Sequence, residues 1–167
     1  MSLPTTAAAS IDIEAPPSAV YDLLSDVTRM GEWSPECHRC EWLDVPNQVG
    51  SRFRGHNKSG PARWSTTAKV LAADPPSTFA FATFYRDRVS TRWTYDLEDR
   101  GGRTRLTESF ASEMTPWFIA LAERLFVRDR QQQLEAGIAT TLAALKAAAE
   151  AEPASQSGEP GHPTRST

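Results

Sequence analysis

The chain has 167 residues, 40% of them hydrophobic and 23% charged, and its formal net charge is -3. This length is typical of one domain with a substantial core. A weakly acidic chain has no overall field that draws it to nucleic acid, so we expect no nucleic-acid partner. The N-terminus lacks the pattern of a signal peptide, and no apolar run reaches the roughly 20 residues of a membrane span. We therefore expect a cytoplasmic protein without stable membrane insertion.

The N-terminal segment predicts a strand and then a helix. Ile11 and Ile13 alternate with other residues within 7–14, as in a half-buried strand. A proline is tolerated in the first turn of a helix, where its missing N–H would have no partner. Pro17 therefore opens a short amphipathic helix over residues 17–25.

A second, very short helix is expected to follow directly. Thr28 can cap its N-terminus, and the helix would carry Met30 and Trp33. Pro35 ends it, because the residue before a proline is disfavoured in a helical conformation.

Six further strand-like runs follow, separated by short segments rich in Gly, Pro, Asn and Asp. Short turn-forming separators predict antiparallel hairpins, and they leave no room for the crossover helix of a parallel sheet. The sequence thus predicts an antiparallel sheet of about seven strands. After the first strand, the expected strands cover residues 39–43, 51–57, 62–73, 78–85, 89–98 and 103–112.

The longest helix is expected over residues 115–149, with Thr115 as its cap. Its apolar stripe repeats at helical spacing and should face the sheet. The residues of this stripe are Leu134, Ile138, Leu142 and Leu145.

These elements form one domain of the α+β class, a curved antiparallel sheet around a long C-terminal helix. The domain is expected over residues 7–150, after a flexible N-terminus at 1–6. Residues 151–167 are polar and rich in Pro, Ser and Gly, so they predict a disordered tail.

Strand alternation predicts that large aromatic residues and a few polar ones share the face covered by the helix. Apolar walls with a few polar groups are typical of a small-molecule pocket. The alternative is that the rings fill a solid core. We expect a cavity for a hydrophobic ligand, lined by Trp33, Phe53, Gly55, Asn57, Trp64, Thr66, Phe79, Phe81, Trp93, Tyr95, Glu108, Phe110 and Phe118.

Glu108 and Tyr95 are the candidate catalytic residues within this set. A carboxyl group in an apolar pocket has a raised pKa and can act as an acid or base near neutrality. The alternative for Glu108 is an ion pair with an arginine of the long helix at the sheet rim. Tyr95 could orient a ligand carbonyl or only satisfy its hydroxyl in the core. Asn57, if buried, needs a partner such as a ligand head group or water.

Cys37 and Cys40 have the two-residue spacing of zinc knuckles and of thioredoxin-type redox centres. Zinc needs about four ligands, and only His38 and His56 could add to the pair. The redox interpretation requires the first cysteine at a helix N-terminus, whereas here it precedes a strand. We expect two ordinary thiols, no metal site and no cofactor.

The order of elements and several segments resemble the START-like helix-grip superfamily (SRPBCC). Within it, the chain resembles the bacterial polyketide cyclase/dehydrase and lipid-transport group. The resemblance covers roughly residues 8–149, and the segments that carry it are 15–27, 32–35, 49–55, 93–95 and 102–108. It implies a helix-grip fold and a lipid, polyketide or similar hydrophobic ligand, but no fixed catalytic triad. We expect a monomer or homodimer.

Three functions stay open at this stage, because fold-level resemblance does not establish chemistry. The first is noncovalent binding or transport of a hydrophobic small molecule. The alternative is an enzyme of the polyketide cyclase/dehydratase type that uses Glu108, Tyr95 and Asn57. A regulatory or interaction protein with a vestigial pocket is a third possibility.

Overall fold

A computed structural model describes residues 6–85, 88–113 and 130–152. Within these ranges, no helix combines the length and the hydropathy needed to cross a membrane.

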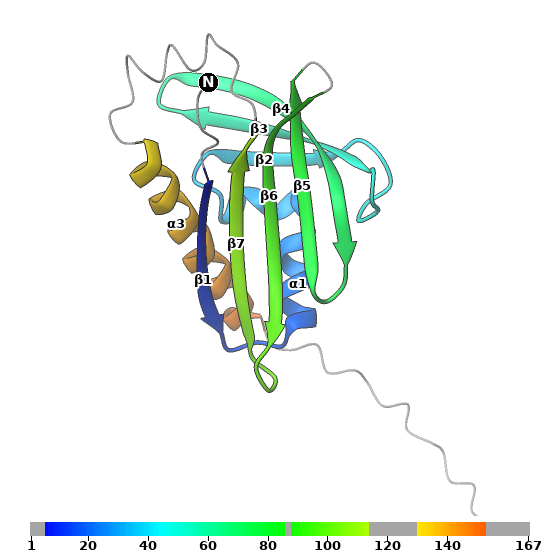
Figure 1. Cartoon of the computed structure of the whole chain (residues 1–167), viewed down its shortest axis with the longest axis vertical. Coiled ribbons are helices and arrows are strands. Elements are labelled where there is room, and N and C mark those ends of the chain that lie inside the picture. Colours follow the sequence, from blue (N-terminus) through cyan, green and yellow to red (C-terminus); the bar gives the residue numbers. More distant parts are fainter. Residues whose placement is uncertain (1–5, 86–87, 114–129, 153–167) are drawn as a thin grey trace, which may run out of the picture.

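Seven strands form one antiparallel sheet in the order β1-β7-β6-β5-β4-β3-β2 (Figure 1). The strands are β1 (Thr6–Ile13), β2 (Cys37–Trp42), β3 (Arg52–Ser59), β4 (Ala62–Asp74), β5 (Thr78–Tyr85), β6 (Arg88–Asp99) and β7 (Thr104–Ser112). Consecutive strands from β2 to β7 are hairpin neighbours, as their short separators predict. The antiparallel seven-stranded sheet is confirmed, and each strand boundary lies within two residues of its expected position.

The turn between β6 and β7 shows how the sequence fixes these hairpins. Gly101 and Gly102 have φ values of 73° and 85°, which other residues rarely adopt. The backbone N–H of Gly102 donates to Asp99 Oδ1 at 2.9 Å. The turn therefore combines two residues that tolerate positive φ with a side chain that satisfies a backbone donor.

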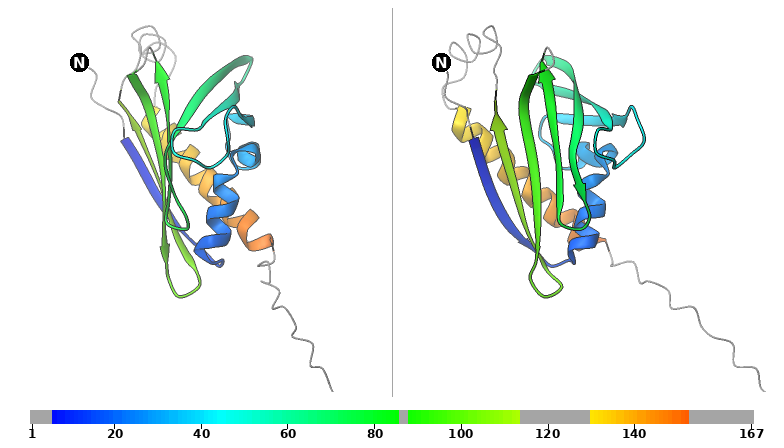
Figure 2. Two further views of the ribbon diagram at one scale, coloured as in Figure 1. Left: turned by 90° about the vertical axis from the view of Figure 1, so that its right-hand side faces the viewer. Right: turned by 45° about the vertical axis from the view of Figure 1, so that its right-hand side comes forward.

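The sheet is strongly curved, and Figure 2 shows β2 and β3 turned over the helices on its concave side. The pairing register shifts in β4 between Val70 and Ala72, and in the β5–β6 pair between Thr83 and Phe84. Such bulges bend a strand and increase its local twist. They help one sheet to enclose the helices.

Two short helices follow β1, as expected: α1 (Pro17–Ser25) and the 3₁₀ helix η1 (Val27–Glu32). The cap of η1 differs from the expectation, because Asp26 rather than Thr28 fills that role. The Asp26 carboxylate accepts from both the backbone N–H and the hydroxyl of Thr28. The carboxylate of Asp26 thus accepts a hydrogen bond from a backbone N–H two residues later, which is an Asx-type cap. Trp33 lies just beyond η1, and its backbone N–H donates to the carbonyl oxygen of Met30.

The C-terminal helix is α3 (Arg130–Ala151), which crosses the concave side of the sheet and contacts β1, β7 and α1 (Figures 1 and 2). The expected helix began at residue 115, and residues 114–129 lie outside the described part. Ile138, Leu142 and Leu145 are buried, and Leu134 is partly buried against the core. The apolar stripe expected from the sequence thus forms the packed face of the helix.

The C-terminal end of α3 is held to β1 by polar contacts. Lys146 Nζ donates to the carbonyl oxygen of Asp12 at 2.7 Å. The backbone N–H of Glu14 donates to Glu150 Oε1 at 2.8 Å. Both contacts lie at the end of β1, so they fix where the helix crosses the sheet.

Candidate functional site

Strand register gathers the candidate residues on the concave face. Across the sheet, Tyr95 on β6 lies opposite both Phe79 on β5 and Glu108 on β7. Glu108 in turn lies opposite Ala9 on β1. Phe79, Tyr95 and Glu108 are buried, and Ala9 is partly buried against the same core. Alternation along the strands predicted this shared face.

Aromatic rings form much of this face. The ring centroids of Phe53 and Phe81 are 5.1 Å apart and those of Phe81 and Tyr95 are 6.5 Å apart. Trp93 and Phe110 are closer, at 4.6 Å, and Trp93 keeps partial exposure. These are distances at which aromatic pairs attract each other. The rings form two groups along the aromatic wall, one running from β3 to β6 and one between β6 and β7.

Glu108 and Tyr95 form a buried hydrogen-bonded pair on this wall. The Tyr95 hydroxyl donates to Glu108 Oε1 at 3.0 Å, and Glu108 is only 1% exposed. The second carboxyl oxygen, Oε2, is buried and has no hydrogen-bond partner within the described part of the chain. The side chains of the long-helix arginines lie outside the described part of the chain, so the ion pair considered from the sequence stays untested.

Burial decides the ionisation of this pair. Loss of solvation raises the pKa of Glu108 to about 8, although the Tyr95 hydrogen bond acts in the opposite direction. Burial, and then the charge of Glu108, also raises the pKa of Tyr95 above its ordinary value. Glu108 is therefore mainly a neutral carboxylic acid at pH 7. With Oε1 accepting from Tyr95, the acid proton belongs on Oε2, which makes Oε2 a hydrogen-bond donor.

Asn57, Thr66 and Gly55 already contact other residues of the protein. Asn57 Nδ2 donates to Thr66 Oγ1 at 3.3 Å, and both side chains are partly exposed. A Cβ atom on Gly55 would lie 3.5 Å from the sulfur atoms of both Cys37 and Cys40. The space above Gly55 is thus occupied by two thiols.

Two further aromatic candidates, Trp33 and Trp64, differ in their exposure. Trp33 is 4% exposed, and the Arg29 guanidinium lies 6.0 Å from its ring. Trp64 is 42% exposed, on a part of β4 where the neighbouring side chains are also exposed. Phe118 lies outside the described residues.

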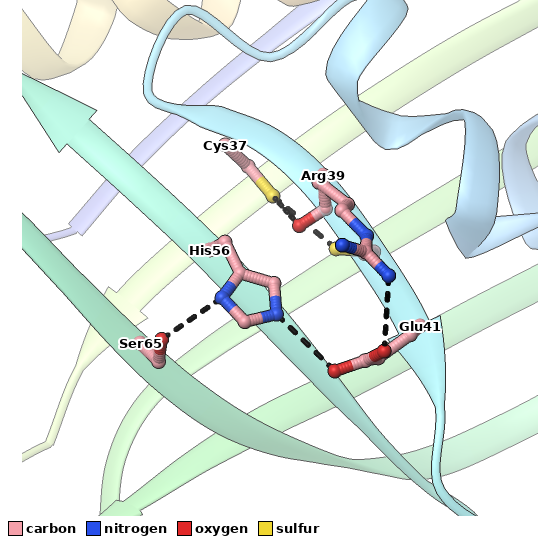
Figure 3. Close-up of polar contacts among 6 residues, drawn as sticks. Cys37, Arg39, Glu41, His56 and Ser65 are labelled. Carbon is pink, nitrogen blue, oxygen red and sulfur yellow. Dashed lines mark hydrogen bonds and ion pairs between the residues drawn. The ribbon is translucent and has the colours of Figure 1, made fainter.

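The two cysteines lie together on β2, with their sulfur atoms 3.2 Å apart. Figure 3 shows Cys37 beside a polar network on the outer face, in which His56 Nε2 contacts Glu41 Oε1 at 3.2 Å. Ser65 Oγ lies 3.0 Å from the other nitrogen of His56. The short distance between the two sulfur atoms could not be predicted, because the sequence does not indicate the register of β2 against β3. In the part of the chain that the structure describes, no three His, Cys, Asp or Glu residues gather to hold a metal ion.

An open hollow of about 540 Å³ lies along β1, β7 and β6. Its walls combine outward-facing residues such as Ala8, Thr94 and Ser109 with Phe110 of the concave face and Glu135 of α3. Neither Tyr95 nor Glu108 lines it. This hollow therefore shares Phe110 with the expected ligand-binding set but does not reach Glu108. A cavity beside Glu108 stays a prediction.

Residues 4–150 match the sequence profile of the family described as "Polyketide cyclase / dehydrase and lipid transport". None of the curated protein sequences compared with the chain matches it.

Solved structures extend this similarity. The polyketide-cyclase-like protein Cgl2372 from Corynebacterium glutamicum is 33% identical, with a TM-score of 0.62 over 87% of this chain and 91% of that chain. The Zhui aromatase/cyclase from Streptomyces sp. R1128 is 18% identical, with a TM-score of 0.68 over 89% and 94% of the two chains. The major latex-like protein 151 from Panax ginseng is 12% identical, with a TM-score of 0.66 over 88% and 98%. The last two share the fold.

Proposed function

Because the chain belongs to the polyketide cyclase/dehydrase and lipid transport family, we propose that it binds a hydrophobic small molecule between the concave face of its sheet and its C-terminal helix. Membership confirms the resemblance found in the sequence. The aromatic wall supports the proposal, since pockets for such ligands are lined mainly by apolar and aromatic side chains.

The observation that carries the proposal is the unpaired Oε2 of Glu108. Most buried polar atoms have a partner, and a buried atom without one calls for an explanation such as a missing ligand or water. Because Oε2 bears the proton of the neutral acid, the group that fits it is an acceptor. We assign the ligand a carbonyl oxygen on an otherwise apolar skeleton, which is the chemistry of a polyketide or an acyl lipid.

Two fluorescent probes test this binding function: a naphthyl ketone and an alkylnaphthalene of the same size. Both should bind the wild type, and the ketone should bind more tightly. Glu108→Leu should weaken ketone binding by about 3- to 10-fold, the value of one hydrogen bond, and leave the hydrocarbon within about twofold. Fluorescence titration at pH 6.5 measures each affinity.

A double variant guards against misfolding. Glu108→Leu alone leaves the Tyr95 hydroxyl buried without its acceptor, whereas adding Tyr95→Phe removes both polar partners. The double variant should show the same selective loss of ketone binding. Equal loss of both probes would contradict the carbonyl assignment, and absence of binding by the wild type would overturn the binding function itself.

A second function is favoured by the neutral state of Glu108. A carboxylic acid with a pKa of about 8 is close to the operating pH, where proton transfer by a positioned side chain is most effective. Glu108, oriented by Tyr95, could protonate or deprotonate a bound poly-β-ketone during aldol closure or dehydration. This is polyketide cyclase/dehydratase-type catalysis, in the same cavity.

A synthetic poly-β-ketone thioester separates catalysis from binding alone. If the protein is an enzyme, the wild type should accelerate cyclisation, followed by absorbance of the conjugated product. Glu108→Gln keeps a hydrogen-bond donor but transfers no proton, so it should bind the ketone probe and lose at least about 100-fold in rate. Equal rates with and without wild-type protein would leave binding as the function.

A further inference from the structure

The two cysteines share one face of β2 because the strand contains a bulge. Residues three apart on a regular strand point to opposite faces. Here the register against β3 shifts around His38, so that Cys37 lies opposite Asn57 and Cys40 lies opposite Gly55. Asn57 and Gly55 are two residues apart and point the same way. The bulge therefore turns both thiols to the concave side.

The resulting geometry is close to that of a bonded pair. The two sulfur atoms are 3.2 Å apart, so they must approach by about 1.1 Å to reach the length of a disulfide bond. The two cysteines lie opposite Asn57 and Gly55, two residues apart on β3. Such residues are roughly 6.6 Å apart along a strand, a spacing within the Cα range that disulfides accept. Gly55 has no side chain to separate them, since its Cβ would touch both sulfurs.

The two thiols are chemically unequal. The hydrogen bond with Cys40 lowers the pKa of Cys37 to about 7, against the effect of burial, and backbone hydrogen bonds at Arg39 and His56 act in the same direction as Cys40. In the thiol form, Cys37 Sγ also donates to the carbonyl oxygen of Arg39 at 3.4 Å (Figure 3). The hydrogen bond between the two thiols and burial raise the pKa of Cys40. Of the η1 side chains, Met30 contacts Cys40 and does not titrate, while Arg29 and Glu32 pair with each other. A thiolate next to a protonated thiol is the arrangement of an attacking and a resolving cysteine.

Access limits the oxidant to a small molecule. Cys37 and Cys40 are only 6% and 5% exposed. However, β2 is an edge strand of the sheet, and the residues on either side of Cys37, Glu36 and His38, are exposed. A molecule the size of hydrogen peroxide can reach such a site more readily than a bulky disulfide.

We propose that Cys37 and Cys40 form a redox-active dithiol that reduces a small peroxide and closes into a disulfide within β2. The Cys37 thiolate attacks one peroxide oxygen, the O–O bond breaks, and the departing hydroxide takes a proton to become water. This leaves a sulfenic acid on Cys37. The Cys40 sulfur then attacks the Cys37 sulfur, an S–S bond forms and the S–O bond breaks. The departing hydroxide takes the proton of the Cys40 thiol and leaves as a second water. Two thiols lose two electrons in all, the peroxide gains them, and an external dithiol restores the reduced pair.

Hydrogen peroxide and thiol counting test the proposal on the whole protein. Reduced wild type should have two thiols that react with a maleimide after denaturation, none after peroxide, and two again after dithiothreitol. The oxidised monomer should lose about 2 Da, the mass of two hydrogens. The oxidation rate should rise with pH around pH 7, as the thiolate of Cys37 forms. This experiment needs no ligand, so its failure is independent of the proposed function.

Single variants separate the roles of the two thiols. Cys40→Ser should stop at the sulfenic acid, which dimedone traps on Cys37. Cys37→Ser should react at least roughly tenfold more slowly, because Cys40 forms little thiolate. The double serine variant is the control and should keep the fold. Two reactive thiols remaining in peroxide-treated wild type, sulfinic acid without a disulfide, or disulfides only between chains would overturn the proposal.

Discussion

The wild-type protein should lose roughly 2 to 3 kcal/mol of unfolding free energy between pH 5 and pH 7, and Glu108→Gln should abolish this loss. The cause is the pKa of Glu108, which burial raises from 4.5 to about 8 in the folded protein. The unfolded chain releases this proton near pH 4.5. Between the two pKa values the folded state therefore holds one proton more, and its stability falls by about 1.4 kcal/mol for each pH unit.

The pH window isolates Glu108 from other groups. Glu32, Glu41, Asp44 and Glu150 have lowered pKa values, so their contribution to stability is lost only as the pH falls below the usual carboxyl range. The lowered pKa of Cys37 acts with the opposite sign to Glu108, since it adds stability as the pH rises from about 7 towards 9. Between pH 5 and pH 7 the Glu108 effect should dominate the difference between wild type and variant.

Urea unfolding at several pH values measures this dependence. The exposed Glu98, which pairs with Arg100 on the surface, provides the matched control. Glu98→Gln should keep the wild-type profile, because its side chain stays in water. Parallel profiles for the wild type and Glu108→Gln would show that the carboxyl is ionised in the folded protein, and the donor role assigned to Oε2 would be wrong.

The sheet could be predicted because its signal is local. Alternation places Tyr95 and Glu108 on one face, and turn residues such as Gly101 and Gly102 force neighbouring strands into hairpins. The Tyr95–Glu108 pair then follows from hairpin register alone. The raised pKa of Glu108 could also be anticipated, since it depends mainly on burial.

The arrangement of β2 could not be predicted, because a bulge has no clear sequence signature. Strict alternation separates Cys37 from Cys40, and only the shifted register against β3 brings them together. The same shift fills the space above Gly55 with sulfur, although the sequence suggested open space there. The prediction that Thr28 caps η1 was wrong for a related reason. Asp26 and Thr28 are both good cap residues, and only backbone geometry decides between them.

Leu142→Ala should cost about 2 to 5 kcal/mol of unfolding free energy. Leu142 is 2% exposed and belongs to the core between α3 and the sheet. Alanine has the higher helix propensity, so an exposed leucine in the same helix would lose nothing on this change. Any destabilisation therefore reports lost packing and the cavity left behind.

A graded series makes this test of the helix position specific. Ile138→Val, one turn earlier and 1% exposed, removes one methylene and should cost about 0.5 to 1.5 kcal/mol. Leu43→Ala removes the same atoms as Leu142→Ala from a side chain that is 38% exposed, and it should cost less than about 0.5 kcal/mol. The shift of the urea midpoint, at constant m-value, gives the loss of unfolding free energy for each of the three variants. If Leu142→Ala cost no more than Leu43→Ala, α3 would not pack on the sheet through this stripe, and a ligand cavity between them would have no wall on the helix side.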